Sequence, residues 1–204
     1  MVLEDLIDDA GAGIEAIGRH LDRLSPDQRW AEAGNLSRDR QRVLYLKAAA
    51  SAPLQLSDLV PQEAFLEPVV HDGCNTLPVP NGIRHFRKHF CRPSGGEGSR
   101  LYGFNETPLR RLIGPGYFVA YETGSSPGWA ERGNVVVDYF QVPSTPVPEH
   151  WPPVVSNDEG LQRFVYRGTR DFLRRVSAQV CVGAVYKGDR AMGHYFVLCR
   201  LDQA

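Results

Sequence analysis

Residues 71–91 contain most of the side chains in this chain that could bind a metal ion: three of the six histidines and two of the four cysteines. If residues 83–90 form a helix, His85 and His89 lie on one face, where two imidazoles can share a metal ion. The sequence has no zinc-finger spacing and no HExxH motif, so a metal ion is an alternative hypothesis and no cofactor is predicted. The candidate metal ligands are His71, Cys74, His85, His89 and Cys91.

The same segment is basic. Arg84, Arg87, Lys88 and Arg92 follow one another without an acidic residue anywhere between positions 73 and 94. Guanidinium and ammonium groups bind carboxylates and phosphates, and like charges at helical spacing repel one another. We therefore expect at least two of these side chains to converge on an acidic partner or an anion-sized cleft, together with His85.

Two residues of the second half could form a general-base pair. Asp138 lies within an apolar, β-branched run, and His194 lies in a similar apolar run near the C-terminus. If both side chains point to the inner face of one sheet, a carboxylate and an imidazole would meet there. Buried polar side chains are more often structural, so the pair is a weak catalytic candidate.

Aromatic residues next to these positions are candidates for lining a pocket. Tyr139 and Tyr195 alternate along their strands with Asp138 and His194, so the two sets cannot all face the same side. The candidate ligand-binding residues are Arg84, His85, Arg87, Lys88, Tyr117, Tyr121, Tyr139 and Tyr195.

The elements that would position these residues follow from hydrophobic periodicity. Residues 3–24 show apolar positions at alternating gaps of four and three, which predicts helices with one apolar seam. Residues 116–122 and 134–142 are aromatic and β-branched, as is typical of strands. Residues 159–176 have the pattern of a helix, and residues 178–187 and 190–201 predict a hairpin around Gly188-Asp189. The two-residue turn places Cys181 opposite Phe196.

This order predicts an α+β fold. N-terminal helices are followed by a curved antiparallel sheet, arranged strand-strand-helix-strand-strand, with helices packed on one face. We expect a helical N-terminal region over residues 1–67 and an α+β domain with the antiparallel sheet over residues 68–204. A pocket would lie between the sheet and the helix at 159–176.

Composition limits the classes of partner. The chain has 204 residues, 42% of them hydrophobic and 23% charged, with a net charge of −1. Nucleic acid is therefore not expected as a partner, and the apolar runs are too short for a membrane span. The acidic, amphipathic start differs from a secretory leader, so we expect a cytoplasmic protein with reduced cysteines.

The leading hypothesis is a soluble protein that binds a small, partly apolar, anionic ligand. One alternative is a metal-dependent enzyme that uses the His71–Cys91 cluster. Another is a protein-interaction module whose N-terminal helix binds a partner, or forms a homodimer through residues 3–24. The sequence alone leaves open whether the protein is an enzyme.

Overall fold

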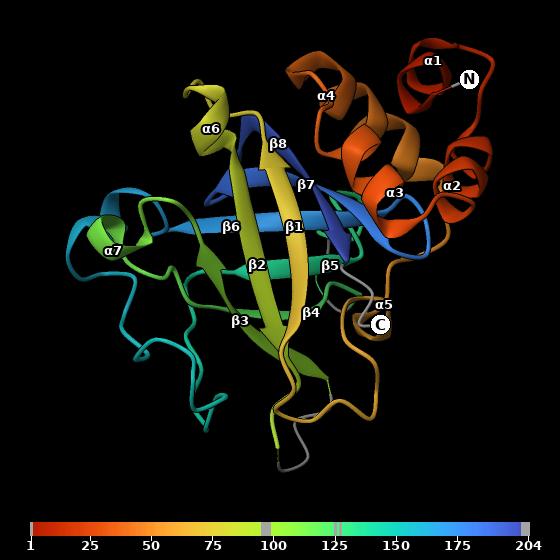
Figure 1. Cartoon of the computed structure of the whole chain (residues 1–204). Helices are drawn as coiled ribbons and strands as arrows, with labels where there is room; N and C mark the ends of the chain where they lie inside the picture. Colours follow the sequence, from red (N-terminus) through yellow and green to blue (C-terminus); the bar gives the residue numbers. More distant parts are fainter. Residues whose placement is uncertain (1, 95–98, 125, 127, 201–204) are drawn as a thin grey trace.

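Eight antiparallel strands form a closed barrel in the computed structural model, which describes residues 2–94, 99–124, 126 and 128–200 (Figure 1). The strands are β1 (Val69–Asn75), β2 (His85–Cys91), β3 (Arg100–Glu106), β4 (Phe118–Glu122), β5 (Val135–Asp138), β6 (Thr169–Arg175), β7 (Val180–Lys187) and β8 (Arg190–Arg200). Each strand pairs with the next one in the sequence, and β8 returns to pair with β1. This closure leaves no exposed sheet edge.

The closed barrel corrects the expected fold. We expected an open curved sheet of four strands interrupted by a helix at residues 159–176, but the sheet has eight strands and closes on itself. The segment expected as a helix divides into a 3-10 turn, η2 (Leu161–Phe164), and strand β6. Gly168 separates the two with a positive φ of 73°, a conformation that interrupts a helix. The expected pocket between sheet and helix therefore does not exist in that form.

Several predicted strands are present. The segments 116–122 and 134–142 contain β4 and β5, and β7 and β8 form the hairpin around Gly188; residue 201 lies outside the described residues. The register of this hairpin was predicted wrongly. A bulge between Ala184 and Tyr186 shifts the pairing, so Cys181 lies opposite Leu198 instead of Phe196. All four cysteines are buried free thiols.

The segment at residues 83–90, whose helical form was the condition for pairing His85 with His89 on one face, is mostly a strand. A single turn, α6 (Asn81–Arg84), ends directly before β2. Because side chains alternate along a strand, Lys88 and Phe90 point into the barrel, whereas Arg87 and His89 lie on its outer surface. The positive charges of this segment are thus divided between two faces of the barrel wall.

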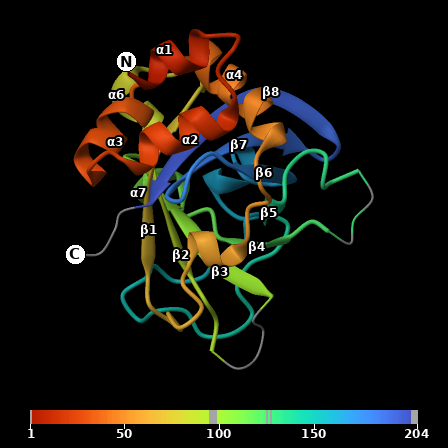
Figure 2. The same cartoon turned by 90° about the vertical axis from the view of Figure 1, so that its right-hand side faces the viewer.

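The elements described before β1 are helical. The first four of them, α1 to α4, form a layer outside the barrel beside β7 and β8 (Figures 1 and 2). The helices are α1 (Leu3–Asp8), α2 (Ile14–Asp22), α3 (Pro26–Ala33), α4 (Arg38–Lys47) and α5 (Leu56–Leu59), with a 3-10 turn η1 (Ala48–Ala50) after α4. Ser25 and Ser37 cap α3 and α4 by accepting hydrogen bonds from the backbone N–H groups of Gln28 and Arg40.

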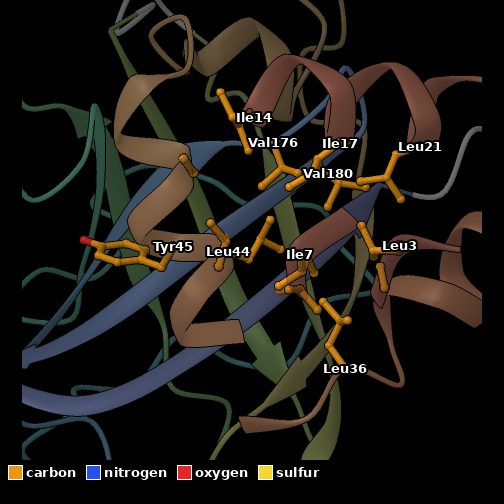
Figure 3. Packing of buried hydrophobic residues seen from close by; sticks show 14 of the residues in the cluster. Leu3, Ile7, Ile14, Ile17, Leu21, Leu36, Leu44, Tyr45, Val176 and Val180 are labelled. Carbon is orange, nitrogen blue, oxygen red and sulfur yellow. The ribbon is translucent and has the colours of Figure 1, made fainter. Parts of the chain in front are cut away.

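The apolar seam of residues 3–24 faces this barrel wall. Leu3, Ile7, Ile17 and Leu21 are fully buried, and they pack with Val176, Val180 and other residues of the wall in one cluster (Figure 3). The side chains that suggested a homodimer are therefore covered within the chain itself. Within the described residues, no helix is both long and apolar enough to cross a bilayer.

One end of the barrel is closed by residues 54–60, which include α5. Leu54, Leu56, Leu59 and Val60 are buried in the same cluster as the side chains of the barrel interior. Polar side chains near the ends of the strands form hydrogen bonds to the backbone carbonyl groups of this segment. His71 Nε2 lies 3.0 Å from the Leu59 carbonyl oxygen, and Arg92 and Arg200 donate to the carbonyls of Val60 and Asp58.

Candidate functional site

The opposite end of the barrel contains a cavity of about 350 Å3. Loops that join β1 to β2, β3 to β4 and β5 to β6 surround its mouth, and the second of these loops contains α7 (Arg110–Ile113). The walls are mostly apolar. Their apolar and aromatic members are Leu77, Val79, Ile83, Phe86, Leu109, Ile113, Tyr139, Val165, Tyr166, Val185, Tyr195 and Phe196.

The floor of this cavity is a polar cluster around Lys88. The Lys88 ammonium donates to Asn105 Oδ1 at 2.9 Å, to the Tyr139 hydroxyl at 2.5 Å and to Asp171 Oδ2 at 3.1 Å. The Tyr139 hydroxyl in turn donates to Asp171 at 3.2 Å. All four side chains are at most 5% exposed, and all four line the cavity. They come from β2, β3 and β6 and from the residue after β5, so distant parts of the chain meet here.

Aromatic rings enclose the Lys88 ammonium. The Nζ atom lies 4.9 Å from the ring centre of Phe118, 5.1 Å from Tyr139, 5.3 Å from Phe196 and 5.8 Å from Phe86. Rings at such distances stabilise a positive charge through their electron-rich faces. The cluster is thus a cationic group held in an aromatic cage, with one carboxylate as its counter-ion.

Three glycines make room for the cage. Phe86 lies opposite Gly73, Phe118 opposite Gly103, and Phe196 opposite Gly183 on the neighbouring strands. A Cβ atom on Gly103 would approach Phe118 Cζ to 2.3 Å, and one on Gly183 would approach Phe196 Cζ to 2.3 Å. These approaches are too close for any side chain, so glycine at these positions lets the rings lie flat against the barrel wall.

Burial shifts the ionisation of the cluster. Desolvation lowers the pKa of Lys88, although the Asp171 carboxylate opposes this shift. Desolvation raises the pKa of Asp171, and Lys88 opposes that shift in turn. The two pKa values therefore lie closer together than those of free lysine and aspartate, and a proton can pass from Lys88 to Asp171 at a lower energetic cost than in water. Desolvation also raises the pKa of Tyr139 well above its ordinary value, which keeps the phenol protonated.

A wider hollow of about 620 Å3 lies near the closed end. It is lined by side chains such as Gln55, Gln62, Arg100 and Glu122, which are polar and largely exposed. The buried Arg92 in this lining donates to backbone carbonyls of the closing segment. Among the described residues, the lining of this hollow therefore presents no buried polar group aimed at a ligand, in contrast to the cavity over Lys88.

The basic residues do not converge. Arg87 is half-exposed and pairs with Asp72 at 2.9 Å on the outer surface, whereas Lys88 pairs with Asp171 inside. Arg84 donates to the backbone carbonyls of Asn75 and Leu36. The expectation of one shared acidic partner or cleft for these residues was wrong, because β2 sends successive side chains to opposite faces. His85 is also separate from Lys88, since its ring packs against Trp30.

The candidate metal ligands are also spread over both faces. His71 is inside at the closed end, while Cys74 packs under the N-terminal helices. His89 stacks on Phe104 outside the barrel and pairs with Glu106 at 2.9 Å. Cys91 lies in a separate outer cluster around Trp151. Within residues 2–94, 99–124, 126 and 128–200, no group of three or more His, Cys, Asp or Glu side chains is arranged to hold a metal ion.

Asp138 and His194 do not meet as a pair. Asp138 is on the outer face of β5, where Tyr121 donates to it at 2.7 Å and Arg170 lies 3.2 Å away. His194 lines the mouth of the cavity. The two side chains therefore lie on opposite sides of the barrel wall, and the structure gives no support to a general-base role for the pair.

The four candidate tyrosines have different positions. Tyr139 is part of the cavity floor, and Tyr195 borders the mouth while its ring packs against Tyr45. Tyr117 belongs to the outer cluster with Trp151, and Tyr121 contacts Asp138 outside. Only Lys88, Tyr139 and Tyr195 of the eight candidate ligand-binding residues line the cavity over the cluster.

Sequence reasoning missed Asp171 altogether. It was assigned to a helix. In a helix, neighbouring residues do not alternate between two faces, so the positions of Asp171, Phe172 and Leu173 gave no indication of a buried acidic side chain. Read as a strand, residues 169–175 place a lone acidic side chain on the face that also carries Leu173, and that pattern is the signal that could have identified it.

No family model, no curated protein and no solved structure matches this chain. The geometry and chemistry of the cavity are therefore the basis for a functional assignment.

Proposed function

We propose that the protein binds a small, mainly apolar molecule in the open end of the barrel, with a polar end group at the cluster of Lys88 and Asp171. The observation that supports this most strongly is an apolar cavity of about 350 Å3 whose floor is a buried charged cluster. Its volume is at the lower end of the range for small-molecule sites, and eight-stranded barrels have room inside for one small ligand. The apolar walls would supply affinity, and the polar floor would fix the orientation of the ligand.

The buried ion pair itself favours a functional role. Lys88 and Asp171 are 2% and 5% exposed, so both charges are removed from water. Such pairs rarely add net stability, because desolvation offsets most of their attraction, and apolar replacements are often as stable. A charged pair at the floor of an apolar cavity is better explained by recognition of a ligand than by folding.

The cluster also limits the end group of the ligand. Lys88 and Asp171 together carry no net charge, so a ligand carboxylate would be favoured only if Asp171 held a proton. The raised pKa of Asp171, caused by its burial, lowers the cost of that proton. The anionic ligand expected from the sequence therefore remains within the proposal, together with neutral carbonyl and hydroxyl compounds. Among residues 2–94, 99–124, 126 and 128–200, no contact favours a metal-dependent enzyme or a helix-mediated interaction module.

Calorimetric titration of the whole chain with straight-chain alcohols tests the proposal. Each additional buried CH2 group contributes about 0.8 kcal/mol, so affinity should rise about fourfold per carbon until the chain fills the cavity. Val185 lines the cavity, and Val185→Trp should occupy part of it and weaken binding. Val154→Trp is the matched control, because Val154 is exposed and is not part of the cavity lining.

Two results would contradict the proposal. One is an affinity that does not depend on chain length, which would indicate contact with the surface only. The other is unchanged binding by a folded Val185→Trp protein. Comparing octanol, octanoate and octanal at one chain length then identifies the end group that the floor prefers.

A further inference from the structure

Lysine is rare in this chain, and one lysine is placed at the floor of the cavity. The sequence has three lysines, Lys47, Lys88 and Lys187. Lys47 donates to the backbone carbonyls of Asp9 and Ala12 outside the barrel, and Lys187 is exposed at the end of β7. Among these three amines, Lys88 alone lines the cavity over the cluster.

An amine can condense with a carbonyl compound to form an imine, and the neighbours of Lys88 are the groups that this reaction requires. This reaction needs an uncharged amine, an acid that protonates the departing oxygen, and a counter-ion for the cationic product. Asp171 lies 3.1 Å from Nζ and can accept the ammonium proton, which leaves a free amine beside a carboxylic acid. The Tyr139 hydroxyl, 2.5 Å from Nζ, can donate a hydrogen bond to the oxygen of a bound carbonyl group.

We infer that Lys88 forms a reversible imine with an apolar aldehyde bound in the barrel cavity. This inference rests on the proposed function, because the aldehyde has to occupy the same cavity. It goes further in naming the chemical class of the ligand and the atom that it bonds.

The step balances in atoms and charge. The ammonium of Lys88 first gives one proton to the Asp171 carboxylate. The amine nitrogen then attacks the aldehyde carbon, one of its two protons moves to the oxygen, and a carbinolamine forms. Asp171 returns its proton to the hydroxyl group, which leaves as water, and the nitrogen keeps one proton. The products are a protonated imine, the Asp171 carboxylate and one water molecule, and neither an oxidant nor a reductant is consumed.

The surroundings of Nζ also suit the product. The protonated imine carries the same positive charge as the ammonium, so the rings of Phe118, Tyr139, Phe196 and Phe86 continue to stabilise it. Asp171 remains its counter-ion. The apolar walls limit the access of water, which slows hydrolysis of the imine, while the open mouth lets the released water leave.

Reductive trapping of the whole chain tests the inference. The protein is incubated with increasing octanal and sodium cyanoborohydride at neutral pH, and the modified lysine is identified by peptide mass mapping. The lowered pKa of Lys88 raises the uncharged fraction of this amine at neutral pH, and the cavity holds the aldehyde beside it. We expect an octyl group on Lys88 at aldehyde concentrations on the order of tenfold below those that modify Lys187. The modification should saturate, and excess octanol should prevent it.

Lys47 and Lys187, which lie outside the cavity, are the internal controls, so the test does not depend on a variant. A second measurement uses the double variant Lys88→Met with Asp171→Leu, which removes both members of the ion pair and leaves no unpaired charge. This variant should lose the saturable adduct, while Lys47 and Lys187 should react with octanal as they do in the unchanged protein.

The outcomes separate the two proposals. If calorimetry shows that octanal and octanol bind in the cavity, but the adduct forms only on Lys47, Lys187 or the N-terminal amine, the imine is refuted and the proposed function stands. If neither compound binds, both proposals fail. A saturable Lys88 adduct that octanol suppresses supports both.

Discussion

The two ends of the barrel use buried polar side chains in opposite ways. At the closed end, His71, Arg92 and Arg200 reach carbonyl groups of the segment that covers the interior. At the open end, Lys88 and Asp171 bond mainly to other side chains, and they lie below a cavity. The polar groups of the closed end therefore fix a lid of main chain in place. Those of the open end line a cavity.

This difference indicates which polar groups belong to folding. A buried donor that bonds a backbone carbonyl satisfies a group that would otherwise be unpaired, and it stabilises the fold. A buried ion pair costs desolvation and contributes little net stability. The closed end is thus structural, and the open end carries the features of a site. The following changes test this division, starting with the largest expected effect.

Replacing Lys88 alone should have the largest effect. Lys88→Met leaves the Asp171 carboxyl buried without its counter-ion, and the free energy of unfolding should fall by about 3–5 kcal/mol. Adding Asp171→Leu should restore most of the loss, because no charge is then left unpaired. Urea unfolding followed by circular dichroism measures both variants. A single variant as stable as the unchanged protein would show that the pair is not buried as described.

The closed end should respond to pH through His71. Burial lowers the pKa of His71 from 6.5 to about 4, so the folded protein keeps this imidazole neutral. As pH falls below 6.5 the unfolded chain takes up a proton that the folded chain does not, and stability decreases until about pH 4. The total loss from this group is roughly 3 kcal/mol.

Unfolding of the unchanged protein and of His71→Asn at a series of pH values isolates this contribution. The profile of the variant is subtracted from that of the unchanged protein, because the raised pKa of Asp171 makes the folded protein more stable as the pH falls, opposite to the effect of His71. The variant should lack the part of the pH dependence between pH 4 and 6.5 that belongs to His71. Exchange of the exposed His150 for Asn is the matched control. Equal pH profiles for all three proteins would exclude His71 as the cause.

The comparison between the ends also shows what sequence patterns can predict. Residues 116–122 and 134–142 were predicted as strands because they are aromatic and β-branched, as in Val135-Val136-Val137, and the last hairpin was predicted from the turn at Gly188-Asp189. The strand β2 was missed because its inner face includes Lys88 and its outer face includes Arg87. A polar residue on the buried face removes the alternation that identifies a strand. Lys88, which lies at the centre of the candidate site, is therefore also the residue that made β2 difficult to predict.

Closure of the barrel could not be predicted from local patterns. It requires pairing of β1 with β8, which are separated by most of the chain. Lys88 and Tyr139 were named as candidates from their residue types, but nothing in the sequence indicated that they meet. Their partner Asp171 belongs to a segment that was assigned to the wrong element. Convergence of this kind depends on tertiary structure alone.

The aromatic cage should depend on Gly103. An alanine there would place its Cβ 2.3 Å from Phe118 Cζ and from the His89 carbonyl oxygen, so the ring or the strand has to move. We expect Gly103→Ala to reduce the free energy of unfolding by about 1–3 kcal/mol and to weaken binding of octanol. Gly82→Ala is the control, because a Cβ at Gly82 meets nothing within 4 Å. Equal stability of the two variants would mean that the Phe118 ring can move aside without cost, and that the cage does not depend on Gly103.

Removing the neighbouring charge on the outer face should have the smallest effect. The Arg87 side chain is 55% exposed, and it pairs with Asp72 at the surface. Exposed ion pairs contribute less than about 1 kcal/mol, so Arg87→Gln should leave both stability and octanol affinity almost unchanged. A large loss of binding in this variant would place the ligand outside the barrel, and the distinction between Arg87 and Lys88 would fail.

A crystal structure of the protein with 8-bromooctanol tests the central claim most directly, because anomalous scattering locates the bromine atom without ambiguity. We expect the alcohol inside the open end, with its hydroxyl group against the cluster of Lys88 and Asp171 and its bromine towards the mouth beside Leu109 and Val165. Bromine found only on the outer surface, or a cavity that stays without ligand at saturating concentration, would contradict the account.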